Sequence, residues 1–155
     1  MYRNTHMSVA LTFRRPQRMA LAASIPFWYD QKTGNDDSCV LAYGGQRKNF
    51  HEHIQDLTDY VAIMSYRRHA TGDDSIGHHI EVERAYAEWI GRRVCAGLET
   101  LEIKDRPEVS FHGLPPSEFW FQKEKIDQAL GDRGGFGGVI VHSYETFRPY
   151  LSTQP

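Results

Sequence analysis

Four short apolar runs constrain the fold more than any other feature of this sequence. Within each run the apolar residues follow one another continuously instead of alternating with polar ones. Strands that are apolar on both faces are typical of parallel sheets, which are covered on both sides. The runs therefore predict four buried parallel strands, at residues 19–29, 60–66, 94–98 and 139–143.

A stretch with helical spacing follows each of the first three predicted strands. Asn49 can cap a helix whose positions 50, 53, 54 and 57 share one face, and Asp74 or Ser75 can cap a second with positions 76, 80, 87 and 90 on one stripe. A third helix can begin at Ser117 and stop at Gly131. The order β-α-β-α-β-α-β predicts an α/β fold of about four β-α units.

The predicted loops are long after the strands and short before them. The long ones cover residues 31–48, 67–74 and 100–116, and the last contains a possible extra strand at 109–111. Long loops therefore cluster at the carboxyl ends of the strands. In barrels and in open α/β sheets this is the edge at which binding and catalytic sites are built.

Length and charge exclude several classes of function. The 155 residues suit one compact domain. With 18 Lys and Arg against 20 Asp and Glu, the net charge of −2 is too balanced to attract nucleic acid. No stretch approaches the 18 or so consecutive apolar residues that a membrane-spanning helix needs, so no membrane partner is expected.

The sequence divides into a loose arm, a domain and a tail, at residues 1–18, 19–151 and 152–155. The basic and small residues around positions 14–25 make a poor signal peptide because the apolar stretch is short, and a cytoplasmic location is the default expectation. Cys39 and Cys95 match neither a disulfide framework nor a zinc motif.

Asp30 and Glu99 are the carboxylates that we single out for chemistry, since each follows an apolar run. Two carboxyl groups that flank a glycosidic bond are what glycoside hydrolysis requires, one to protonate the leaving oxygen and one to attack or to activate water. The alternative is structural: Asp30 caps its loop, and Glu99 pairs with Arg67 or another cation at the same edge.

Five further residues at the predicted strand ends are candidates for substrate binding. Aromatic rings can stack on sugar rings, and they also occur as ordinary, partly buried side chains. The histidine can donate to a substrate hydroxyl or be a satisfied core residue, and the arginine is a further cation at this edge. These candidates are Trp28, Tyr66, Arg67, His142 and Tyr144.

Two other clusters resemble ligand sites without matching one. His69, Asp73, Asp74, His78 and His79 are the right types for a metal, but their spacing fits no ligand pattern and a solvated loop with a helix cap is the better interpretation. The glycine-rich segment 134–138 precedes a strand instead of opening a helix, so it is not a phosphate loop. Neither a metal nor a cofactor is predicted.

Together, the strands and their ends resemble the carboxyl-terminal half of a (β/α)8 TIM barrel related to glycoside hydrolases, over residues 19–151. The segments that carry the resemblance are residues 25–30, 59–67, 94–100 and 137–144. It implies that the four strands are similar to the fifth to eighth of a barrel. Glu99 would then end the seventh strand, where many retaining glycosidases keep their nucleophile. Their acid/base comes from the fourth strand, for which the chain shows no counterpart.

The sequence leaves two main hypotheses for the function. One is a glycoside-hydrolase-like half barrel that binds or hydrolyses a carbohydrate-type ligand through Glu99 and Asp30. The other is a non-catalytic binding or structural half barrel, truncated or completed as a homodimer, because four strands cannot close a barrel and leave two sheet edges exposed. A small doubly wound protein ranks lower because the sequence lacks a glycine-rich turn from strand to helix.

Overall fold

The computed structural model describes residues 19–30 and 38–152. Its centre is a four-stranded, all-parallel sheet with the strand order β1-β4-β5-β6. The strands are β1 (Ala22–Pro26), β4 (Tyr60–Met64), β5 (Arg93–Glu99) and β6 (Phe136–His142). The predicted α/β class and its parallel strands are thus confirmed. The predicted arm at 1–18 lies outside the described residues, as does the tail except for Ser152.

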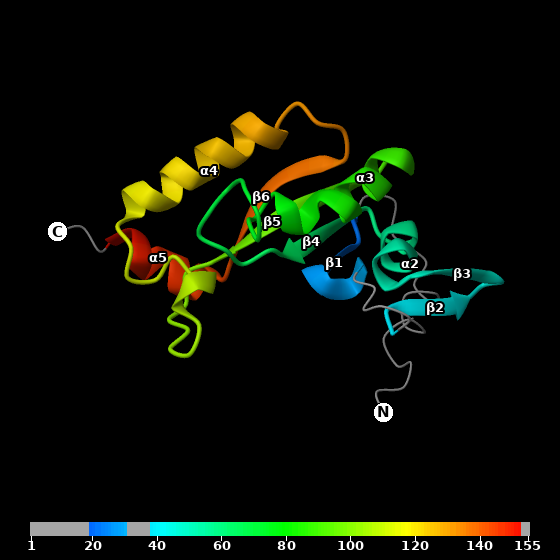
Figure 1. Ribbon diagram of the computed structural model, residues 1–155, viewed down its shortest axis with the longest axis horizontal. Helices are drawn as coiled ribbons and strands as arrows, with labels where there is room; N and C mark the ends of the chain where they lie inside the picture. Colours follow the sequence, from blue (N-terminus) through cyan, green and yellow to red (C-terminus); the bar gives the residue numbers. More distant parts are fainter. Residues whose placement is uncertain (1–18, 31–37, 153–155) are drawn as a thin grey trace.

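Helices and a hairpin surround this sheet. Figure 1 shows the strands side by side in the centre, with helix α2 and the hairpin toward one end and helices α4 and α5 toward the other. The helices are α2 (Phe50–Leu57), α3 (Glu81–Trp89), α4 (Pro116–Leu130) and α5 (Tyr144–Ser152), and the hairpin consists of β2 (Val40–Tyr43) and β3 (Gln46–Asn49). Among the described residues no helix is long and apolar enough to cross a membrane.

One face of the parallel sheet forms the main hydrophobic core. Side chains of registered residues in neighbouring parallel strands point to the same face. Ile25, Ile63 and Ala96 are registered partners on this face and belong to the buried core cluster. Phe119 and Ile126 of α4 belong to the same cluster, so α4 contributes its apolar side to the core on this face.

The opposite face of the sheet is partly open. Ala62, Met64 and Ile140 alternate with the core residues of their strands and are only partly buried. Ser24 of β1 is exposed. The central strand β5 is buried along its length after Arg93, whereas the two edge strands are not. Parallel sheets are normally covered on both faces, so this second face is an unusual feature of the fold.

The predicted helix boundaries are partly correct. Helix α2 begins after Asn49 in a capping box with Glu52, whose carboxylate accepts the Asn49 N–H at 2.8 Å. Ser75 accepts the His78 N–H at 3.2 Å and so starts a short 3-10 turn, after which α3 begins only at Glu81. Helix α4 ends at Gly131 as predicted, but Pro115 and not Ser117 is its N-cap.

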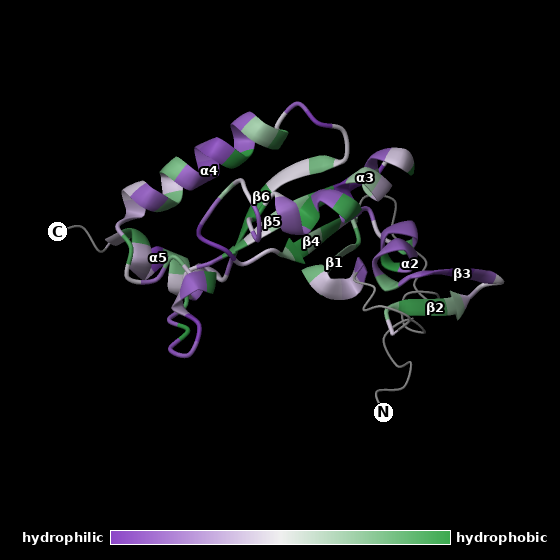
Figure 2. Cartoon of the chain, viewed as in Figure 1, coloured by the Kyte–Doolittle hydropathy of each residue, from purple (hydrophilic) through white to green (hydrophobic). Residues whose placement is uncertain are grey.

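Two segments differ from the predictions. Residues 31–48 were expected to be loop throughout, whereas 40–49 form the hairpin, in which Gly44 and Gly45 both have positive φ. Figure 2 shows β2 as hydrophobic and β3 as hydrophilic. The extra strand at 109–111 is absent from the described structure. Ser110 and Phe111 instead make single hydrogen bonds with the Glu99 carbonyl, and no ladder forms.

Helix α2 buries more than the predicted face. Of the predicted positions 50, 53, 54 and 57, His53 is buried and the other three are partly buried, and His51 and Gln55 outside that face are also buried. His53 Nε2 lies 2.9 Å from the Leu41 carbonyl of the hairpin, and the His51 ring meets Tyr86 of α3 edge-on. The unpredicted hairpin therefore covers His53, and α3 packs against His51, which lies outside the predicted face.

Candidate functional site

The carboxyl ends of the four parallel strands lie at one edge of the sheet, which we call the rim. It comprises the residues that end and follow β1, β4, β5 and β6, namely 26–30, 64–67, 99–101 and 142–146. All the predicted site residues belong to the rim because parallel strands bring their carboxyl ends together. Within it, the structure brings some of these residues into direct contact and leaves others apart.

Glu99 is the best-held carboxylate of the rim. Its Oε1 accepts the backbone N–H groups of Thr100 and Leu101, both at 2.7 Å, and its Oε2 lies 2.7 Å from His142 Nδ1. The side chain is 3 % exposed. Hydrogen bonds to an ionised acceptor are the stronger class, so the carboxylate is fixed in one orientation.

The exposed ring of His142 contacts the buried Glu99 carboxylate. The two residues are registered partners at the ends of β5 and β6, which explains why their side chains meet. Since an ionised carboxylate only accepts hydrogen bonds, Nδ1 is assigned as the donor, and Nε2 of the neutral ring is then an acceptor. The His142 side chain is 62 % exposed, so this ring can contact both Glu99 and a ligand.

Tyr66 completes this cluster from the neighbouring strand. Its ring centroid lies 5.9 Å from that of His142, and the rings are inclined by 30°. A Cβ at Gly97 would lie 2.6 Å from the Ile63 carbonyl oxygen and 3.4 Å from the Tyr66 ring, so glycine permits this close approach. Burial, and then the Glu99 charge, raise the pKa of Tyr66, which keeps its hydroxyl protonated as a donor.

Asp30 belongs to a different group of residues. It ends the 3-10 helix η1 (Phe27–Asp30) after β1, two strands away from β5. Burial raises the pKa of Asp30, and a hydrogen bond with its own backbone, and then the nearby His79 and His78, oppose that rise. In the described part of the chain no hydrogen bond or ion pair joins Asp30 to Glu99. The structure therefore places both carboxylates at the rim without bringing them into contact.

Asp30 is also the charge that acts on Glu83, a residue that the sequence did not single out. Glu83 is fully buried, and neither carboxylate oxygen has a hydrogen-bond partner among the described residues. Burial, and then the negative charge of Asp30, raise the pKa of Glu83 to about 8. Glu83 falls on the helical stripe that contains Ile76, Ile80 and Ala87. Its burial could have been predicted from that spacing.

Among the described residues Arg67 pairs with Asp74, and the partner of Glu99 at this edge is His142. The Arg67 Nε and Nη2 donate to Asp74 Oδ1 at 2.9 and 2.8 Å, and its Nη1 donates to the Tyr66 carbonyl. His79 Nε2 lies 2.6 Å from the same Asp74 oxygen. Arg67, and then His79, lower the pKa of Asp74 to about 2.

The loop that contains Asp74 is held by these pairs without forming a recognisable metal centre. Among the residues that the structure describes, no group of three or more His, Cys, Asp and Glu side chains is arranged to hold a metal ion. Of the histidine and aspartate cluster noted in the sequence, Asp74 pairs with His79 and with Arg67 of the rim.

The remaining aromatic candidates are exposed on the rim. Trp28 is half exposed and packs edge-on against Phe27. Tyr144 is largely exposed at the start of α5. Both provide flat surfaces to solvent.

Thr146 is a residue that the sequence analysis missed. Its hydroxyl lies 3.0 Å from that of Thr100 and donates to the Ser143 carbonyl at 3.2 Å. These bonds attach the first turn of α5 to the segment that holds Glu99.

Comparison with known proteins gives no match: no family model, no curated protein and no solved structure is significantly similar to this chain.

Proposed function

We propose that the rim binds a carbohydrate-type ligand, an oligosaccharide or a glycoside, with Glu99 as its acidic centre. The observation that carries this proposal is the fixed Glu99 carboxylate, which lies beside an exposed imidazole and a tyrosine ring. Sugar recognition uses carboxylate and imidazole groups for hydroxyls and aromatic surfaces for the apolar faces of the ring. Tyr66 and His142 supply these groups next to Glu99.

Hydrolysis would need a second carboxyl group, and Asp30 is our candidate. As the acid, Asp30 would give its proton to the glycosidic oxygen while the bond to the anomeric carbon breaks. Glu99 would attack that carbon or take a proton from the attacking water. Burial raises the pKa of Asp30, which is the direction that a general acid needs. The glycoside-hydrolase-like half barrel of the sequence analysis is consistent with this assignment.

The Glu99→Gln variant tests this function because it preserves shape and removes the charge. We expect affinity for the ligand to fall about tenfold or more, since a charged hydrogen-bond partner is lost. Any release of nitrophenol from nitrophenyl glycosides should fall about 100-fold or more. Calorimetric titration with a panel of neutral oligosaccharides, and a nitrophenol assay, measure the two effects.

Glu124→Gln is the matched control, because Glu124 is exposed on α4 and bonds only to Gln128 among the described residues. It should bind and react like the original protein. Equal affinity and equal rates in the Glu99→Gln variant and the original protein would show that the carboxylate is not the centre of the site.

A second candidate function is a non-catalytic half barrel that a second copy of the chain completes. The partly open sheet face favours it, as do the edge strands β1 and β6, each of which has one neighbour in the described sheet. Two such sheets related by a two-fold axis would supply eight strands. The apolar face of each copy would then be covered.

The mass in solution tests this second function. We expect light scattering to give twice the chain mass of 17.9 kDa. Met64→Lys places a charge on the partly open face and should shift the protein to monomer, whereas Val82→Lys on the exposed side of α3 should not. A monodisperse monomer of the unaltered chain at high concentration would contradict pairing.

A further inference from the structure

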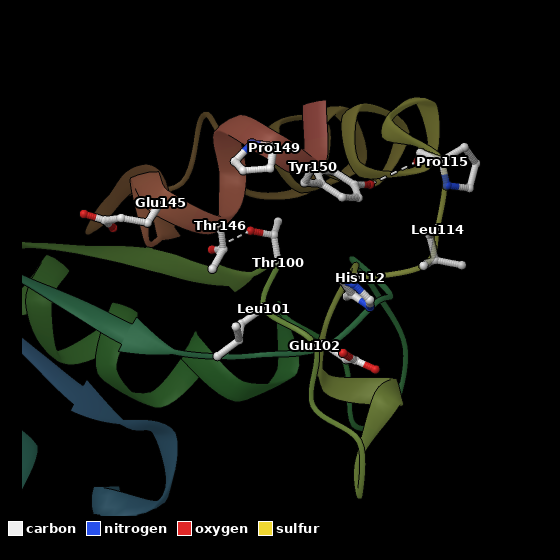
Figure 3. Close-up of a pocket in the computed structure, with 11 residues that line it drawn as sticks. Thr100, Leu101, Glu102, His112, Leu114, Pro115, Glu145, Thr146, Pro149 and Tyr150 are labelled. Atoms are coloured by element: carbon white, nitrogen blue, oxygen red, sulfur yellow. Dashed lines mark hydrogen bonds between the residues drawn. The ribbon is translucent and has the colours of Figure 1, made fainter. Parts of the chain in front are cut away.

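A pocket lies beside Glu99, between the segment that follows β5 and helix α5. Figure 3 shows Thr100 and Leu101 on one side of it, Leu114 and Pro115 at one end, and Thr146, Pro149 and Tyr150 from α5 on another side. Its volume is about 720 Å³, within the range of small-molecule sites.

Apart from the His112 ring and the carboxylates of Glu102 and Glu145, the wall of this pocket offers few free hydrogen-bonding groups. The Tyr150 hydroxyl donates to the Pro115 carbonyl at 3.1 Å, and the Thr100 and Thr146 hydroxyls bond to each other. The apolar side chains Leu101 and Leu114 make up much of the remaining wall. A sugar, whose hydroxyls each require a partner, suits such a wall poorly, whereas a hydrophobic ring loses little by leaving water.

The mouth of the pocket is acidic. Glu102 and Glu145 are both exposed and lie on the pocket's border, and Figure 3 shows their carboxylates at separate points of its edge. Hydrogen bonds from its own backbone N–H and from Ser143 lower the pKa of Glu145, so it is ionised at neutral pH. Arg68 and Lys104 line a separate, smaller hollow on the other side of Glu102 and His112.

The pocket also shares its wall with the Glu99 site. Thr100 and Leu101 line the pocket with their side chains, and their backbone N–H groups hold the Glu99 carboxylate. A molecule in the pocket would therefore contact the segment that fixes Glu99. It would not occupy the place of the carbohydrate that we propose at the rim.

We propose that this pocket binds the hydrophobic, ring-shaped part of a small organic amine, with the ammonium group at the acidic mouth. The ring would lie against Leu101, Leu114 and Pro149, and the ammonium group would pair with one of the two carboxylates, Glu102 or Glu145. This binding is separate from carbohydrate recognition at the rim and does not depend on it.

The test compares three probes of the same ring: 1-naphthylmethylamine, 1-naphthylmethanol and 1-naphthoate. Titrations followed by amide NMR should show saturable shifts at Thr100, Leu101 and Thr146. The amine should bind about 1.5- to fivefold more tightly than the alcohol, the range for exposed charge pairs, and the carboxylate should bind most weakly. Equal binding of all three probes, shifts confined to other parts of the protein, or no shifts at millimolar concentrations would overturn the proposal.

Three variants make the test specific. Glu102→Gln combined with Glu145→Gln should abolish the preference for the amine and keep the binding of the alcohol. Leu101→Trp should fill the pocket and weaken all three probes, and Leu101 is exposed enough to accept the larger ring. Glu124→Gln, whose carboxylate is exposed on α4 and does not line the pocket, should bind the amine as the unaltered protein does. A loss of amine binding in that variant would contradict the assignment of the charge contact to Glu102 and Glu145.

Discussion

The free energy of unfolding is expected to fall by about 2 kcal/mol as the pH rises from about 6.5 to 8.5, because burial raises the pKa of Glu83 to about 8. Its pKa in the unfolded chain is the ordinary value near 4.5. Between these two values the unfolded chain releases the Glu83 proton and the folded protein keeps it. Stability from this group is therefore complete below the unfolded pKa and is lost as the pH approaches 8.

His51 has the opposite effect at lower pH. Burial lowers the pKa of His51 to about 4, so the unfolded chain binds a proton there before the folded protein does. Stability from this group is present above about pH 6.5 and is lost as the pH falls toward 4. The two slopes oppose each other from about pH 4.5 to 6.5, and we expect a plateau in that range.

Glu83→Gln isolates the alkaline loss. It should flatten the decline above about pH 6.5 and, near pH 8, should be more stable than the original protein by as much as about 4 kcal/mol. Urea unfolding at a series of pH values measures this difference. Glu88→Gln, on the same helix but exposed, is the control and should keep the decline. An alkaline slope that is the same in the Glu83→Gln variant would exclude Glu83 as its cause.

Phe119→Ala is expected to destabilise the protein by about 3–5 kcal/mol, a large part of the stability of an ordinary domain. Phe119 is 1 % exposed, and its ring contacts those of Phe111, Phe147 and Tyr150. The variant removes the ring that joins α4, α5 and the segment after β5, and the cavity cannot collapse without moving all three.

Phe121→Ala is the matched control for this cavity. Phe121 lies two residues away on the same helix, is 49 % exposed, and its ring contact is with Lys125. Its removal should cost less than about 1 kcal/mol. Urea unfolding at about pH 6 compares the two variants, and similar losses for both would mean that the Phe119 cluster does not hold these elements together.

The parallel sheet was predictable because its physical cause is local. The runs around Ile63, Ala96 and Val139 are apolar at successive positions, the pattern of parallel strands, although in the described sheet only β5 is buried on both faces. The hairpin was missed although Gly44 and Gly45 are the residues that a tight turn with two positive φ angles requires. Its second strand, residues 46–49, is wholly polar and gives no strand pattern.

The site was predictable only in part, since its contacts depend on register and on packing between distant segments. Sequence placed Glu99 and His142 at strand ends, and only the β5–β6 register makes them partners. It could not show that Arg67 pairs with Asp74, seven residues along the same loop, or that Asp30 lies near Glu83 of α3, because both contacts depend on how the loops fold and pack.

The way in which Glu99 is held bears on how freely this protein can change in evolution. Two of the three hydrogen bonds on its carboxylate come from the main chain of Thr100 and Leu101. Every amino acid except proline carries that N–H group. Side chains at 100 and 101 can therefore diversify and reshape the neighbouring pocket while the carboxylate keeps its two backbone donors. Substitutions at 100 and 101 can therefore change which ligand the pocket prefers, while the backbone hydrogen bonds to the Glu99 carboxylate are kept.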